Sequence, residues 1–135
     1  MGGFLDTNVV VRYLTNDPPH LAVKAAAIID SEEELYLTDA ALAEAAYVLI
    51  SPKSYGLPRS SVIEQLTAFC QKTNITVFGL DKAVVLQGLK MCQPSARVSI
   101  DDALIWAAAR SSGTRRVYTF DKDFPDTGIE IHGIG

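Results

Sequence analysis

The sequence predicts an α/β fold, a three-layer α/β/α domain with a central, mostly parallel sheet of four to five strands. Short apolar runs alternate with longer segments of helical periodicity along the chain, and strands separated by helices form right-handed βαβ crossovers. A length of 135 residues is usual for one domain. We therefore expect residues 1–135 to share a single core. Hydrophobic residues make up 48% and charged residues 21% of the chain, which argues against intrinsic disorder.

The first half of the chain is predicted to contain two strands and several helices. The first strand is short because Asp6-Thr7-Asn8 interrupts its apolar run, and proline at positions 18 and 19 favours the start of a helix. Thr38 or Asp39 can cap a later helix, which Pro52 ends. In order, we predict a strand at 4–5, a helical turn or two at 9–14, a helix at 19–29, a strand at 35–37, a helix at 40–50 and another after Pro58.

The second half repeats the alternation of strands and helices. Residues 75–78 are β-branched or aromatic and predict a strand. Asp81 can cap a helix that runs to about Cys92, and Ser99 can start one at 100–110 that Gly113 ends. Residues 117–119 predict a fourth strand and residues 129–131 a possible fifth.

Charge and cysteine content limit the classes of protein that fit. Twelve basic and sixteen acidic residues give a net charge of −4, which argues against broad binding to a phosphate backbone unless metal ions supply positive charge locally. Cys70 and Cys92 are too few for a disulfide scaffold, so we expect both to be buried and reduced. No apolar run approaches the ~20 residues of a membrane span, and the N-terminus lacks a secretory signal. The expectation is a soluble, cytoplasmic protein.

Acidic residues follow the predicted strands. Ligands of open parallel sheets bind beyond the carboxyl ends of the strands. This rule selects Asp6, Thr38-Asp39, Asp81 and Asp121, and Asp123 lies in the same segment as Asp121. Each has a structural alternative, since Asp6 could cap the next helix and Asp123 could sit in a solvated turn.

Two further acidic sites lie in helices that are otherwise apolar. Glu44 is the only polar residue in segment 40–50. A helix apolar nearly all round is expected to be buried, where an ionised carboxylate costs several kcal/mol unless it is paired. Alternatively, Glu44 lies on one solvated stripe. Asp101-Asp102 begins the second apolar helix, and Asp102 could instead form a capping box with Ser99.

Together, Asp6, Glu44, Asp102 and Asp121 fit one cleft. Carboxylates brought together repel one another unless a cation neutralises them, and oxygen ligands favour Mg²⁺ or Mn²⁺. Such a site can activate water and bind a phosphodiester. The chemistry predicted from the residues is phosphodiester hydrolysis.

Four motifs carry a family resemblance: Asp6-Thr7-Asn8, Glu44 in an alanine-rich helix, Asp102-Ala103-Leu104 and the segment 119–124. In this order and spacing they resemble the PIN-domain ribonucleases, above all the VapC toxins of prokaryotic toxin–antitoxin pairs. The resemblance covers residues 4–124 and implies a PIN-like fold.

The resemblance also implies roles for these residues. Asp6, Glu44, Asp102 and Asp121 would bind Mg²⁺ or Mn²⁺, and Asn8 and Thr119 would hold those carboxylates in place. Asp102 is preferred to Asp101 as the third acid because the family's acid directly precedes the Ala-Leu pair, and Asp123 could assist Asp121. The family implies a metal-dependent endoribonuclease, often a homodimer, inhibited by a cognate VapB-like antitoxin.

Two other classes of function remain open. An aspartyl-phosphate phosphotransfer domain of the haloacid-dehalogenase type would want an acid where Asn8 stands, and a receiver domain would have only Asp81 as phosphoacceptor. A catalytically inactive α/β module that binds proteins would tolerate loss of the acids. Three basic residues at a helix end, Arg110, Arg115 and Arg116, fit a solvated end or an RNA phosphate contact. Trp106 and Tyr47 are expected in the core or a dimer interface.

Overall fold

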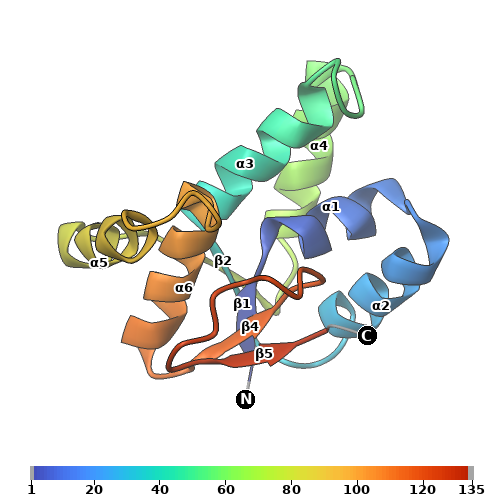
Figure 1. Cartoon of the computed structure of the whole chain (residues 1–135). Coiled ribbons are helices and arrows are strands. Elements are labelled where there is room, and N and C mark those ends of the chain that lie inside the picture. Colours follow the sequence, from blue (N-terminus) through green and yellow to red (C-terminus); the bar gives the residue numbers. More distant parts are fainter. Residues whose placement is uncertain (1, 134–135) are drawn as a thin grey trace.

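A five-stranded sheet lies at the centre of the fold, in the order β3-β2-β1-β4-β5, and every neighbouring pair is parallel (Figure 1). The computed structural model describes residues 2–133. The strands are β1 (Gly3–Leu5), β2 (Leu35–Thr38), β3 (Ile75–Phe78), β4 (Arg116–Tyr118) and β5 (Glu130–His132). This confirms the predicted parallel sheet and the possible fifth strand.

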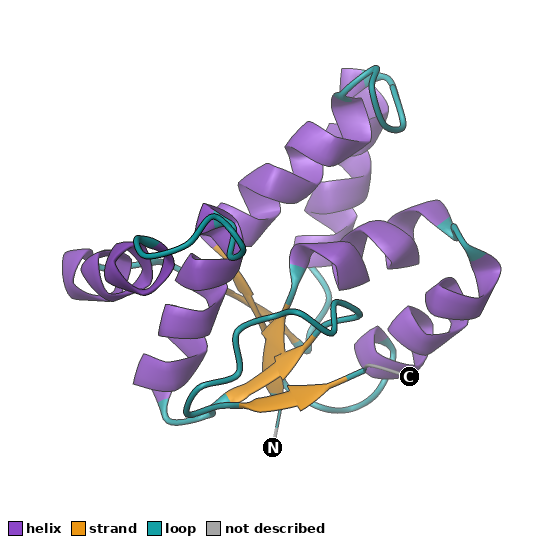
Figure 2. Ribbon diagram, viewed as in Figure 1, coloured by secondary structure: helices purple, strands orange, loops and turns teal. Residues whose placement is uncertain are grey.

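Helices cover both faces of the sheet and make the three predicted layers (Figure 2). The helices are α1 (Thr7–Thr15), α2 (Pro19–Ile29), α3 (Asp39–Ile50), α4 (Arg59–Cys70), α5 (Lys82–Cys92) and α6 (Ile100–Ser112). In Figure 1, α1 and α2 lie on one side of the sheet and α5 and α6 on the other. The helices change side because the crossovers are right-handed and the strand order reverses. Strands β2 and β3 follow on one side of β1, and β4 and β5 follow on the other side.

Helix starts follow the predicted capping residues. Thr38 caps α3, since its Oγ1 accepts a hydrogen bond from the Ala41 N–H at 3.0 Å. Asp81 caps α5 through its Oδ1 and the Val84 N–H at 3.0 Å. Ser99 caps α6 through the Asp102 N–H at 3.3 Å, and Gly113 ends that helix at a φ of 87°, in the left-handed region that favours glycine.

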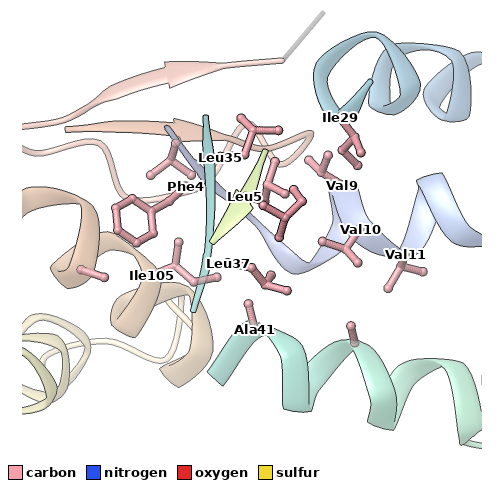
Figure 3. Close-up of a cluster of buried hydrophobic side chains, with 14 of the residues drawn as sticks. Phe4, Leu5, Val9, Val10, Val11, Ile29, Leu35, Leu37, Ala41 and Ile105 are labelled. Atoms are coloured by element: carbon pink, nitrogen blue, oxygen red, sulfur yellow. The ribbon is translucent and has the colours of Figure 1, made fainter. Parts of the chain in front are cut away.

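The core lies between the sheet and its helices. Figure 3 shows Phe4 and Leu5 of β1 among side chains from α1, α2, β2 and α6. Five of the six residues from Ala103 to Ala108 on α6 are buried, and Trp106 is among them, as its apolar sequence predicted. Because β1 has neighbours on both sides in the sheet and helices on both faces, its carboxyl end is held rigidly where the chain turns into α1.

Helix α3 is less buried than its sequence predicts. Only Ala41, Ala45 and Leu49 are fully enclosed, and Tyr47 is 66% exposed. The expectation of burial all round is therefore wrong. The physical reason is position, since α3 projects past the edge of the sheet beside α4 (Figure 1) and packs along one face only.

Cys70 and Cys92 are half-buried rather than fully buried, and both are free thiols. They are the last residues of α4 and α5, where a helix leaves the core. None of the helices within residues 2–133 has the length and apolar character needed to cross a membrane.

Helices α5 and α6 approach closely at Gly88. A Cβ there would lie 3.0 Å from Leu104 Cδ2 and 3.1 Å from the Ala103 carbonyl oxygen. We expect Gly88→Val to lower the free energy of unfolding by roughly 2 kcal/mol, because an overpacked contact must spread. Urea unfolding measures this loss, with Lys90→Ala, at an exposed position on α5, as the control. Equal stability of the Gly88 variant and the wild type would contradict the close packing.

Candidate functional site

An acidic cleft of about 260 Å³ lies beyond the carboxyl ends of β1 and β4, between α1, α3 and the start of α6. Its place agrees with the rule for ligand sites in open parallel sheets. The lining residues are Asp6, Thr7, Asn8, Val11, Arg12, Glu44, Val48, Tyr55, Ser99, Asp101, Asp102 and Asp121.

Asp6 is the residue that links β1 to α1. It is only 3% exposed, and its side chain makes no capping hydrogen bond to α1. Its Oδ2 instead accepts a hydrogen bond from Thr119 Oγ1 at 2.6 Å. Asp6 thus stands at the N-cap position of α1, but its carboxylate is turned toward the end of β4.

A polar network centred on Thr119 joins the ends of β1 and β4. The fully buried Thr119 accepts hydrogen bonds at Oγ1 from the Asp121 N–H at 3.0 Å and from Asn8 Nδ2 at 3.4 Å. Asn8 Oδ1 accepts from the Phe120 N–H at 3.4 Å. These contacts fix Asp6 and the turn that carries Asp121 relative to each other, although they lie more than a hundred residues apart in sequence.

Burial and mutual repulsion raise the pKa values of two carboxyl groups in the cleft. Burial raises the pKa of Asp6 to about 6; the hydrogen bond from Thr119 opposes the rise, and the charges of Asp101 and Asp121 add to it. Burial, followed by the charges of Asp6 and Asp101, raises the pKa of Asp102 to about 7. Asp101 and Asp121 thus lie close enough to Asp6 and Asp102 for their charges to disfavour the ionised forms of those two carboxyl groups.

Glu44 lies on the α3 side of the cleft. Burial raises its pKa, and the charge of Asp101 raises it further. Glu44 is half-buried, so neither complete burial nor a fully solvated position describes it. Asp101 is thus the carboxylate whose charge links Glu44 electrostatically to the other acids, while Asp102 interacts with Asp6.

Asp123 lies outside the cleft lining. It is exposed, and its N–H donates a hydrogen bond to Asp121 Oδ1 at 2.9 Å. Its side chain is in the solvated turn that the sequence offered as an alternative, and its contribution to the cleft is through the backbone, which orients Asp121.

The donor chemistry of the cleft fits a hard divalent cation. Five carboxylates share a small volume, and burial with like charge disfavours the ionised forms of Asp6, Glu44 and Asp102 until a cation is present. Within residues 2–133, no three side chains of the His, Cys, Asp or Glu types converge into a ready-made metal-binding group. Mg²⁺ usually keeps several waters and binds only one or two carboxylates directly, so a closed ligand cage is not required.

Arg12 and Tyr55 also line the cleft, although the sequence did not lead us to predict them as site residues. A signal for Arg12 was present: Asn8, Val11 and Arg12 are spaced i, i+3 and i+4 and so share one face of α1. Tyr55, in the loop after α3, had no comparable signal.

Comparisons with known proteins agree with this architecture. The family model described as PIN domain matches residues 3–130. The crystal structure of VapC20 from Mycobacterium tuberculosis, a toxin that cleaves the sarcin-ricin loop, is similar with a TM-score of 0.74 at 19% identity, over 93% of this chain and 95% of that one. VapBC2 from Rickettsia felis, bound to a DNA fragment from the promoter, is similar with a TM-score of 0.68 at 16% identity, over 98% of both chains. At these identities the likeness shows the fold alone. No curated protein sequence matches the chain significantly.

Proposed function

Because the chain belongs to the PIN-domain family, we propose that it is a metal-dependent endoribonuclease that hydrolyses phosphodiester bonds in RNA. One observation carries the proposal. The ends of β1 and β4 and the helices α3 and α6 bring five carboxylates into one cleft, at a place where a purely structural role would not gather like charges.

Asp6, Glu44, Asp102 and Asp121 would hold Mg²⁺ or Mn²⁺, which when bound lowers the pKa of water and neutralises charge on the phosphate. Thr119 keeps the Asp6 carboxylate oriented through its 2.6 Å hydrogen bond, and Asn8 supports Thr119. The backbone N–H of Asp123 orients Asp121. Asp101 lines the same cleft, and its charge contributes to raising the pKa of Glu44.

We further propose that the protein is the toxin of a VapBC-type toxin–antitoxin pair, acting in the cytoplasm as a homodimer and inhibited by a VapB-like antitoxin. The support is the fold, which is similar to that of a toxin that cleaves the sarcin-ricin loop and to that of a VapBC complex. The exposed Tyr47 on α3 is a candidate dimer contact.

Cleavage of a mixed single-stranded RNA pool tests the proposed activity. We expect cuts with Mg²⁺ or Mn²⁺ and none with EDTA. Glu44→Gln should lose this turnover, while Glu64→Gln, at an exposed position on α4, should retain it. Cuts that persist in EDTA, or a fully active Glu44→Gln variant, would contradict the proposal and favour the protein-binding or phosphotransfer alternatives.

The adjacent acids of α6 should differ in importance. We expect Asp102→Asn to reduce metal-dependent cleavage at least about 10-fold more than Asp101→Asn, since Asp102 is the one whose pKa burial and Asp6 raise to about 7. Initial rates for both variants at saturating Mg²⁺ measure this difference. If Asp101→Asn alone abolishes cleavage, the assignment of the third acid is wrong.

A further inference from the structure

Arg12 is the only cationic side chain among the described residues that line the acidic cleft. It lies one helical turn after Asn8 on the same face of α1, beside a group of carboxylates that would repel an RNA backbone. With a net charge of −4, the protein has no broad positive field to offset that repulsion. The charge of Arg12 should therefore contribute more to RNA binding than a single cation would on a basic surface.

The Arg12 guanidinium is fixed along one edge. Its Nη1 donates hydrogen bonds to Tyr55 Oη at 2.9 Å and to the Asp17 carbonyl oxygen at 3.5 Å. The Tyr55 hydroxyl in turn donates to Asp17 Oδ2 at 3.1 Å. These contacts join the end of α1 to the loop after α3, and they hold in place a side chain that would otherwise have much rotational freedom.

The opposite edge of the guanidinium is unused. Nε is buried without an acceptor in the part of the chain that the structure describes, and Nη2 has no hydrogen bond to any residue from 2 to 133. Nε–H and Nη2–H form the planar fork that binds two oxygens of one phosphate or carboxylate. A buried donor without an acceptor is costly, so an oxygen ligand at this edge would complete the site.

We propose that Arg12 binds a phosphate of the RNA substrate at the rim of the cleft, anchored by Tyr55 and Asp17. The inference rests on the proposed ribonuclease function and assigns the residue that positions the backbone of its substrate. The carboxylates hold the reacting centre, and Arg12 provides the one direct attraction for RNA among the residues that line the cleft.

Binding of a fluorescent single-stranded RNA in the inactive Asp6→Asn background tests Arg12 separately from cleavage. We expect Arg12→Gln to weaken binding about 10-fold and to reduce the slope of log K against log salt by about 0.7, the loss of one phosphate contact. Arg12→Lys, which keeps the charge but not the fork, should fall between. Lys90→Gln removes one positive charge from an exposed position on α5, outside the cleft lining, and should change binding less than about 2-fold.

Cleavage kinetics supply the second test. In the active protein, Arg12→Gln and, more weakly, Tyr55→Phe should raise KM with a smaller effect on kcat, while the Tm of Tyr55→Phe stays near that of the wild type. An unchanged KM and RNA affinity in Arg12→Gln, or an equal loss in Lys90→Gln, would overturn this inference while leaving the ribonuclease intact. If the wild type neither binds nor cleaves RNA, the proposed function itself is wrong.

Discussion

Replacing Asp6 with asparagine is expected to abolish RNA cleavage and, at the same time, to stabilise the metal-free protein at pH 8. The carboxylate is 3% exposed, and burial raises its pKa to about 6, so at pH 8 the folded protein must carry a buried charge. Asparagine has nearly the same shape, is neutral, and can still accept the hydrogen bond from Thr119. Removing the charge should raise the free energy of unfolding by up to about 3 kcal/mol.

The rate of RNA cleavage by Asp6→Asn should fall, whereas the stability of this variant should rise. Partners that merely hold metal ligands are worth 10–100-fold in activity, so loss of a ligand should cost at least about 100-fold. Urea unfolding in EDTA and cleavage in Mg²⁺ measure the two effects on the same preparation. Asp126→Asn, in the exposed loop before β5, is the control and should change neither. Loss of activity together with loss of stability would show that Asp6 serves the fold rather than the reaction.

The metal-free protein should also lose stability as the pH rises. Asp102 and Asp6 have folded pKa values of about 7 and about 6, above the ordinary value of 3.8 expected in the unfolded chain. The folded state therefore binds their protons more tightly. The stability that these groups contribute is full below pH 3.8 and is lost as the pH rises through 6 to 7. Between pH 5 and pH 8 the free energy of unfolding should fall.

Asp102→Asn isolates this effect, because it removes one of the two titrating groups and leaves the rest of the chain unchanged. Its Tm should fall less between pH 5 and pH 8 than that of the wild type. Mg²⁺ should raise the wild-type Tm at pH 8 far more than at pH 5, because protonated carboxyl groups are poor ligands. Thermal unfolding at pH 5, 6.5 and 8, with EDTA or Mg²⁺, measures both. Parallel profiles for the variant and the wild type would contradict the pKa assignment.

Much of the fold could be predicted because local signals agreed with the tertiary structure. Thr38, Asp81 and Ser99 are capping residues that precede apolar helical patterns, and each caps the helix predicted for it. Helix α3 shows the limit of such signals. An apolar sequence predicts burial but does not indicate whether a helix lies over the middle of a sheet, as α6 does, or projects past its edge, as α3 does.

Some residues of the candidate site could likewise be predicted from the sequence, and others could not. Asp6 and Asp121 could be found because strand ends in a parallel sheet meet at one edge. Arg12 shares a helix face with Asn8, but its contact with Tyr55 could not be predicted, because it joins residues 43 positions apart through an irregular loop. The doublet Asp101-Asp102 has two acids on consecutive helix positions, and only the three-dimensional structure shows that both line the cleft and that Asp102 interacts with Asp6.

Calorimetric titration of Mn²⁺ into the protein at pH 6.5 tests most directly whether the carboxylate cleft is a metal site. Measuring in two buffers of different ionisation enthalpy also counts the protons released, since the cation must displace protons from Asp6 and Asp102. We expect binding with proton release in the wild type and in Asp126→Asn, and loss of both in Asp6→Asn. Binding that is absent from the wild type, or unchanged in Asp6→Asn, would contradict a metal site in the cleft.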